Sequence, residues 1–146
     1  MNSIREGDSW PKEILIIDSG KNLDSSELNK LYDNNIRDRE FASILKIISI
    51  HNRLFPGSAR NIGCKEAKET YISFLDVNTI PSSDWLSISF NNVISSKNKI
   101  VFGSTKYIAK SNLEKLFIYA TYGDKPVKTL PGTILHADIL REIGLF

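Results

Sequence analysis

Residues 56–85 constrain the fold more than any other part of the chain. They read as a helix, then the apolar run YISFL, which ends at Asp76 and is followed by the polar turn VNTIPSS. A short apolar run between a helix and a turn predicts a buried strand. In open α/β sheets, ligands bind at the carboxyl edge of the strands, where rigid strands hold the loops. A carboxylate at the end of this run therefore predicts a ligand-binding edge.

The predicted helix before that strand favours an anion at its first turn. Pro56 suits a first helical position, because its missing N–H would have no helical partner there. Ala59, Gly63 and Ala67 are four residues apart and share one face, which lets the helix approach a sheet closely. Its free N-terminal amides and Arg60 would attract negative charge.

Strands and helices alternate along the rest of the chain. Apolar, β-branched runs predict strands over residues 13–17, 44–50, 71–75 and 99–105, with a weaker strand signal at 133–135. The continuous run at 13–17 is typical of a strand buried on both faces, as parallel sheets require. The sequence thus predicts one α/β domain, a mostly parallel sheet with helices on both faces and right-handed connections.

Capping signals predict where several helices begin and end. Asp24 with Glu27, and Ser111 with Glu114, have the spacing of capping boxes. Ser82 or Ser83 is expected to cap a helix from residue 84 onward. A last helix is expected over residues 137–143, closed by the glycine at position 144.

Three motifs in order resemble the family 2 glycosyltransferases of GT-A fold. PGSARNIG, then the strand ending in Asp76 and the later PSSDWL, are similar to the family's central signature, and EILIIDSG is similar to its upstream nucleotide-binding strand. LPGTILHADILREIGLF resembles a later passage of the family. The resemblance covers residues 13–86 well and the remainder loosely.

The resemblance implies a transferase that takes a sugar from a nucleotide diphosphate, such as UDP, to a hydroxyl of a glycan or lipid, with inversion. Asp18 and Ser19 would bind the nucleotide, and Arg60 and Asp76 the sugar nucleotide. Asp76 and Asn78, two residues apart, offer oxygen ligands for one Mg²⁺ or Mn²⁺ ion, although the amide of Asn78 brings no negative charge. The motifs assign no general base.

Each candidate residue also has a structural interpretation. Asp18 stands in an Asp-Ser-Gly turn, where Asp bonds following amides. Asp76 could be a solvated strand end, and Arg60 could contact Cys64 one turn on. Cys64 itself is expected to pack in the interior, and His136 to be a hydrogen-bonded histidine among apolar residues.

Composition limits the classes of function. The 146 residues, 41% hydrophobic and 25% charged, predict one domain over 1–146, and the resemblance would make it a GT-A-like domain truncated at both ends. A net charge of +2 gives no strong field for nucleic acid. One cysteine and two separated histidines provide neither a disulfide nor a zinc site. The single cysteine fits a reducing, cytoplasmic setting, including the inner face of a membrane, and the sequence contains no transmembrane run or signal peptide.

The sequence also bears on two alternative functions. A non-catalytic sugar-nucleotide-binding or assembly module is favoured by the neutral Asn78 and by Lys21, which departs from the family pattern. A Rossmann oxidoreductase is disfavoured, because neither strand end is followed by G-x-G-x-x-G. An unpaired sheet edge in a partial domain would also promote a homo-oligomer.

Overall fold

The computed structural model of the chain describes residues 1–20, 39–123 and 125–146. The predicted capping box of Asp24 and Glu27 lies outside these residues. Among the described residues the helices are α1 (Asn2–Arg5), α3 (Arg39–Ser43), α4 (Pro56–Glu66), α5 (Trp85–Ser95), α6 (Asn112–Tyr122) and α7 (Ala137–Ile143). The strands are β1 (Ile14–Asp18), β2 (Leu45–Ser49), β3 (Tyr71–Ser73), β4 (Ile100–Thr105) and β5 (Val127–His136). None of the described helices is long and apolar enough to cross a bilayer.

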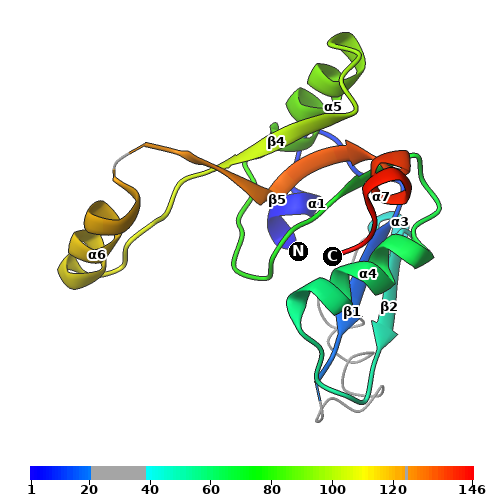
Figure 1. The fold of residues 1–146 in the computed structure, drawn as a ribbon, viewed down its shortest axis with the longest axis horizontal. Helices are drawn as coiled ribbons and strands as arrows, with labels where there is room; N and C mark the ends of the chain where they lie inside the picture. The colour runs from blue at the N-terminus through cyan, green and yellow to red at the C-terminus, as the bar shows by residue number, and fades with distance from the viewer. Residues whose placement is uncertain (21–38, 124) are drawn as a thin grey trace.

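The first two strands form the parallel pair that the sequence predicts. Ile16 of β1 lies beside Ile47 of β2, and both strands consist mainly of β-branched and Leu residues. Helix α4 lies along β1, and a Cβ at Gly63 would be 3.7 Å from the Cγ1 of Ile17, so Gly63 of the predicted small-residue face meets the sheet. Ala67, which was predicted on the same helix face, lies beyond the last helical residue and has an extended backbone. Figure 1 shows α4 beside β1 and β2. The α/β class with a parallel sheet is therefore confirmed.

The second sheet departs from the mostly parallel expectation. Strand β5 lies between β3 and β4 and is antiparallel to both. The chain leaves β4, turns through α6 and comes back, so β5 enters the sheet in the opposite direction. Antiparallel pairing follows from that return. The observed pairing is thus mixed, with a parallel two-stranded sheet and an antiparallel three-stranded sheet among the described strands.

Strand β5 is longer than the predicted 133–135, and β3 is shorter than the predicted 71–75. Pro131 has no N–H to donate, and β4 accommodates it with a register shift between Val101 and Gly103. Gly132, at φ +81°, donates its N–H to the carbonyl oxygen of Phe74 at 2.7 Å. Beyond β3, Phe74 therefore joins β5 only through an isolated bridge to Pro131.

One apolar cluster of the interior lies between β3, β5 and α7. Phe74, Leu135 and Leu140 are buried together, with Cys64 and Ile139 packed against them. Burial of these side chains provides the main stabilisation of the second sheet against α7 and α4. Phe74, two residues before Asp76, is thus anchored in this cluster.

Of the three helix ends predicted from capping signals within the described residues, two are confirmed. Ser111 Oγ accepts the N–H of Glu114 at 3.2 Å, which completes the capping box of α6. Helix α7 ends at Gly144, whose φ of +92° suits glycine. The predicted cap of α5 by Ser82 or Ser83 was wrong: the N-cap residue is Asp84, and its side chain forms no capping hydrogen bond.

Helix α6 projects from the molecule. Figure 1 shows β4 and β5 leading out of the body to α6, which lies at the far end of this excursion. We call residues 106–128 the arm. The arm separates β4 from β5 in sequence and carries α6 away from the edge where α4 begins.

Candidate donor-binding site

Helix α4 begins at the carboxyl edge of the first sheet. Its N-cap residue Phe55 has an extended backbone and Pro56 follows it, which suits a helix start. Near the other end of α4, Glu66 Oε2 pairs with Lys46 Nζ of β2 at 2.7 Å. Since Lys46 lies near the start of β2, α4 runs back along the sheet and its first turn lies where β2 ends. The hydrogen bond from Lys46, then its charge, lowers the pKa of Glu66.

Arg60 and Asp76 are in direct contact at this edge. The Nη2 of Arg60 donates to Oδ1 of Asp76 at 2.8 Å. The side chain of Arg60 is 23% exposed and that of Asp76 is 50% exposed. The guanidinium carbon also lies 5.8 Å from the ring centroid of Phe146. The pair thus joins α4 to the loop after β3 and leaves the carboxylate half open to solvent.

Asp18 and Ser19 lie at the carboxyl end of β1. The carbonyl oxygen of Asp18 accepts the N–H of Ile50 at 2.8 Å, which extends the parallel ladder to the last residue of the strand. Ile17, one residue earlier, contacts Gly63 of α4, which is three residues after Arg60. Asp18 is therefore on the same edge as Arg60. Among the described residues, however, Asp18 and Ser19 form no hydrogen bond or ion pair with Arg60 or Asp76.

Asp76 and Asn78 belong to one exposed turn. The N–H of Thr79 donates to the carbonyl oxygen of Asp76 at 2.8 Å, which closes the turn. The two side chains supply only oxygen ligands of the kind that hard divalent cations prefer, so their chemistry fits Mg²⁺ or Mn²⁺. In the described part of the chain, no three His, Cys, Asp or Glu side chains form a group that could hold a metal ion. This turn could thus provide at most part of a coordination shell.

A contact beneath Arg60 was not predicted from the sequence. The side-chain amide of Asn61 donates through Nδ2 to the carbonyl oxygen of Phe146 at 2.7 Å and accepts the N–H of Phe146 through Oδ1 at 2.8 Å. The ring of Phe146 meets Phe74 edge to face, with centroids 5.4 Å apart. Asn61 thereby positions the aromatic ring that faces the guanidinium of Arg60. The position of Asn61 next to Arg60 in the ARN motif was the one available signal that it has a role. Its partner could not be predicted, because Phe146 is 85 positions away in the sequence.

The structural interpretations of Cys64 and His136 agree with the structure. Cys64 packs against the cluster around Phe74, and burial raises the pKa of its thiol. The Nδ1 of His136 accepts the N–H of Asp138 at 3.2 Å and caps α7, while its ring contacts Tyr71. For Arg60, the observed partner is Asp76 rather than Cys64.

Comparisons with known proteins agree with this architecture. A family model described as glycosyl transferase family 2 matches residues 1–136. An uncharacterized glycosyltransferase of Rickettsia felis is 34% identical over 95 residues, which cover 65% of this chain and 14% of that protein. A hyaluronan synthase of Pasteurella multocida is 24% identical over 105 residues, or 72% of this chain and 10% of that protein.

Solved structures are similar in fold. The S. aureus TarS 1-349 structure in complex with UDP-GlcNAc gives a TM-score of 0.67 at 18% identity and covers 97% of this chain and 41% of its own. Another structure of TarS 1-349 gives a TM-score of 0.62 at 17% identity, covering 97% and 43%. The chain spans less than half of each solved structure and about a tenth to a seventh of each relative. The predicted family and GT-A-like fold are confirmed, and the chain belongs to glycosyl transferase family 2.

Proposed function

We propose that this chain provides the donor-binding part of a glycosyltransferase that moves a sugar from a nucleotide diphosphate to a hydroxyl group of a glycan or a lipid. The observation that carries the proposal is the contact between Arg60 and Asp76 at the carboxyl edge, with Asp18 at the end of β1, the strand that α4 packs on. An exposed carboxylate beside a guanidinium combines a cation-binding group with a phosphate-binding group. A nucleotide diphosphate needs both kinds of partner.

Each residue has a distinct role in this proposal. Asp18 accepts hydrogen bonds from the base or ribose of the nucleotide, and Ser19 beside it also binds the nucleotide. Arg60 binds a phosphate through its planar fork, since a guanidinium can hold two oxygens at once. Because Arg60 is mostly buried by its neighbours and faces Phe146, its charge is already positioned before the ligand arrives. The donor observed in a TarS structure, UDP-GlcNAc, supports a UDP-linked sugar.

Asp76 and Asn78 are the residues that would hold a Mg²⁺ or Mn²⁺ ion. When bound, such an ion supplies positive charge near the diphosphate leaving group. Asp76 would then exchange part of its contact with Arg60 for the cation, which frees the guanidinium for phosphate. Asn78 contributes an oxygen without charge, so we expect a cation site weaker than one with two carboxylates.

Transfer to the acceptor is proposed to be a single inverting displacement. The motifs assign no residue of this chain as the general base that would deprotonate the acceptor hydroxyl. A relative that is a hyaluronan synthase supports a role in polysaccharide synthesis. We propose a cytoplasmic location for this reaction, which includes the inner face of a membrane.

The alternative is a module that binds sugar nucleotide without turnover. The neutral Asn78 and the ion pair that already engages Asp76 favour it. Hydrolysis of UDP-GlcNAc, measured with and without Mn²⁺, separates the two functions. Metal-dependent release of UDP supports the transferase, whereas tight binding with no release supports the module.

The donor site is tested by thermal unfolding with UDP. With Mn²⁺ and UDP at about 100 times its Kd, the ligand adds ~2.7 kcal/mol of stability, which raises Tm by roughly 5–10 °C. Replacing Mn²⁺ with a chelator should reduce this shift. Asp76→Ala should abolish the metal-dependent part, and Asn78→Asp should lower the Mn²⁺ concentration that is needed.

Glu66→Ala is the matched control, because it removes an ion pair of the same helix at the end away from the site. It should shift Tm with UDP as the wild type does. If millimolar UDP with Mn²⁺ leaves Tm unchanged while the fold is intact, the donor site is not at this edge. An equal shift in wild type and Asp76→Ala would remove Asp76 from it.

A further inference from the structure

The arm carries an apolar helix face that no other element covers in the part of the chain that the structure describes. Leu113, Leu116 and Phe117 of α6 are 63%, 66% and 63% exposed. These residues and Ala120 follow the spacing of one helix face. In Figure 1, α6 lies at the end of the arm and away from the sheets. Large apolar side chains on one exposed face mark a surface that binds something.

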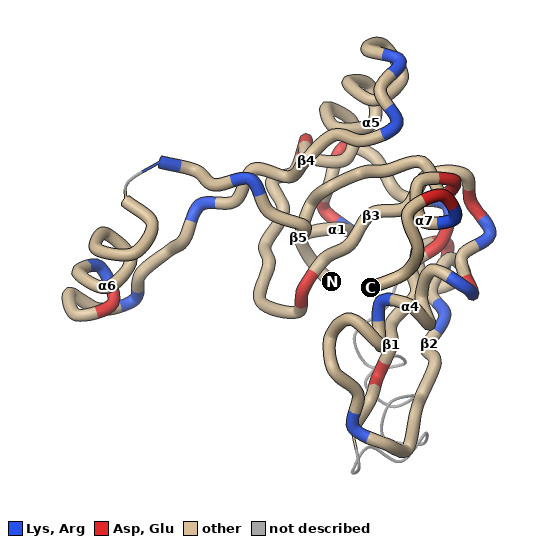
Figure 2. Tube along the Cα trace, viewed as in Figure 1, with Lys and Arg blue, Asp and Glu red and all other residues tan. Residues whose placement is uncertain are grey.

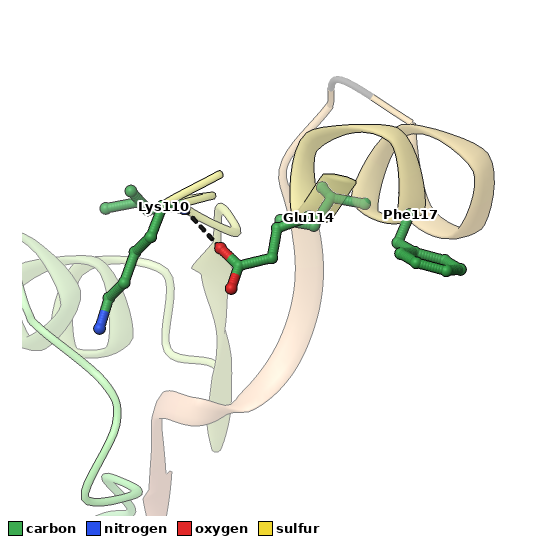
Figure 3. A pocket seen from close by; sticks show the side chains of 5 residues that line it. Lys110, Glu114 and Phe117 are labelled. Carbon is green, nitrogen blue, oxygen red and sulfur yellow. Dashed lines mark hydrogen bonds between the residues drawn. The ribbon is translucent and has the colours of Figure 1, made fainter. Parts of the chain in front are cut away.

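Contacts on the other side of α6 hold this helix against the chain that leads into it. The rings of Tyr107 and Tyr122 stack with centroids 4.2 Å apart, which fixes the end of α6 against the incoming chain. The N–H of Lys110 donates to Glu114 Oε2 at 2.6 Å. Ile108, Lys110, Glu114, Phe117 and Ile118 line a concavity of about 310 Å³ between α6 and the incoming chain, so Phe117 borders this concavity as well as the exposed face. Figure 3 shows Glu114 reaching toward Lys110 and the ring of Phe117 pointing away from it.

The arm is also the basic part of the chain. Residues 106–128 contain five lysines and two acids, a net charge of +3, whereas the whole chain carries +2, so the remainder carries −1. Lys110, Lys115, Lys125 and Lys128 are exposed and pair with no carboxylate among the described residues. Figure 2 shows these basic segments on both sides of α6. Apolar and cationic side chains are therefore combined on one projecting element.

We propose that the arm docks on an anionic lipid surface, with Leu113, Leu116 and Phe117 in the headgroup boundary and the lysines against lipid phosphates. Interfacial helices have this combination of an apolar face and flanking Lys residues. A second copy of the chain fits less well, because two arms would bring net charges of +3 together. A nucleic acid would use the lysines but would leave the apolar face in water.

The docking does not depend on sugar transfer. It adds a specific surface to the membrane location proposed above, and vesicle binding is measured without nucleotide or metal. Absence of vesicle binding would therefore leave the donor-site proposal standing. Conversely, loss of the donor site in Asp76→Ala should not alter binding to vesicles.

The test is co-sedimentation of the 146-residue chain with phosphatidylcholine vesicles that do or do not contain phosphatidylglycerol. We expect binding only to the anionic vesicles, and weaker binding at high salt. Each lysine near an anionic surface contributes about fivefold in partitioning, so Lys110→Gln, Lys115→Gln and Lys125→Gln combined should weaken binding roughly a hundredfold. Leu116→Ser with Phe117→Ser should weaken it by about tenfold or more.

Two matched controls use residues outside the arm. Ile88→Ser with Ile94→Ser removes two half-exposed apolar side chains from α5, a helix of the same length as α6. Lys65→Gln, Lys68→Gln and Lys97→Gln together remove the same charge as the arm variant. Both controls should bind anionic vesicles as the wild type does. Thermal unfolding by circular dichroism confirms that each variant is folded.

Three results would overturn the proposal. The first is that the chain sediments equally with anionic and neutral vesicles, or binds neither of them. The second is that the folded Leu116→Ser, Phe117→Ser variant binds anionic vesicles as the wild type does, or that the control variants lose as much binding as the arm variants. The third is a dimer, detected by sedimentation velocity and lost in that variant, without vesicle binding; the arm would then pair with a second copy.

Discussion

Gly103→Ala is the substitution whose cost follows most directly from the geometry. A Cβ at this position would lie 2.2 Å from the carbonyl oxygen of Pro131, 2.7 Å from the carbonyl carbon of Gly132 and 2.9 Å from the nitrogen of Thr133. All three are backbone atoms, so no side chain can rotate out of the way. Ordinary contacts begin near 3.4 Å, and β4 and β5 would have to separate by roughly 1 Å.

The cost has two parts. Overpacking between strands typically costs about 1–3 kcal/mol. Separation of the strands also breaks the hydrogen bond from the N–H of Gly103 to Oγ1 of Thr133, which is 2.9 Å long and buried, and an unsatisfied buried group costs about 1–3 kcal/mol. We therefore expect a loss of about 2–6 kcal/mol, which lowers Tm by roughly 5–20 °C.

Gly63→Ala is the control, since its Cβ would be 3.7 Å from Ile17, an ordinary contact. Alanine is favoured over glycine within a helix by about 0.5–1 kcal/mol, so this variant should be unchanged or more stable. Urea unfolding at constant pH measures the free energy of unfolding of both variants. If Gly103→Ala lost less than about 1 kcal/mol, β4 would be free to shift and the packing argument would fail.

Two further predictions concern contacts of α4. Because Lys46 lowers the pKa of Glu66, their pair stabilises the fold above the ordinary value of 4.5 and loses this effect as pH falls through the lowered value. Glu66→Gln should therefore be less stable than the wild type near neutral pH and equal to it in acid; a difference that persists in acid would contradict this. Asn61→Ala should accelerate hydrogen exchange of the Phe146 amide, whereas Asn98→Ala should not, and equal protection in both would remove the role given to Asn61.

Much of the fold was predictable because its signals are local. The apolar runs that became β1 and β2 need only their own composition to favour buried parallel strands. The capping box of Ser111 and Glu114 and the glycine after α7 act within a few residues, so their helix ends were predicted correctly. The failure at the start of α5 is also local: Ser82, Ser83 and Asp84 are all acceptable caps, and the choice among them depends on packing.

The candidate site was predictable in part. The motifs drew attention to Asp18, Ser19, Arg60, Asp76 and Asn78, and their roles remain predictions. No sequence signal indicated that Arg60 would contact Asp76 directly, since the two are 16 residues apart on different elements. The distance between the two side chains depends on how α4 packs relative to β3, which the sequence does not show.

The sequence by itself determined the alternation of strands and helices, several helix ends and the family, because these depend on residue type and short spacing. Only the tertiary structure decided that β5 lies antiparallel between β3 and β4, that Asn61 holds Phe146 beneath Arg60, and that the apolar face of α6 stays exposed. In an amphipathic pattern such as that of α6, the residues predict a helix with one apolar face but not whether anything covers it. Which face meets a partner depends on contacts between distant segments, and those contacts form only when the chain folds.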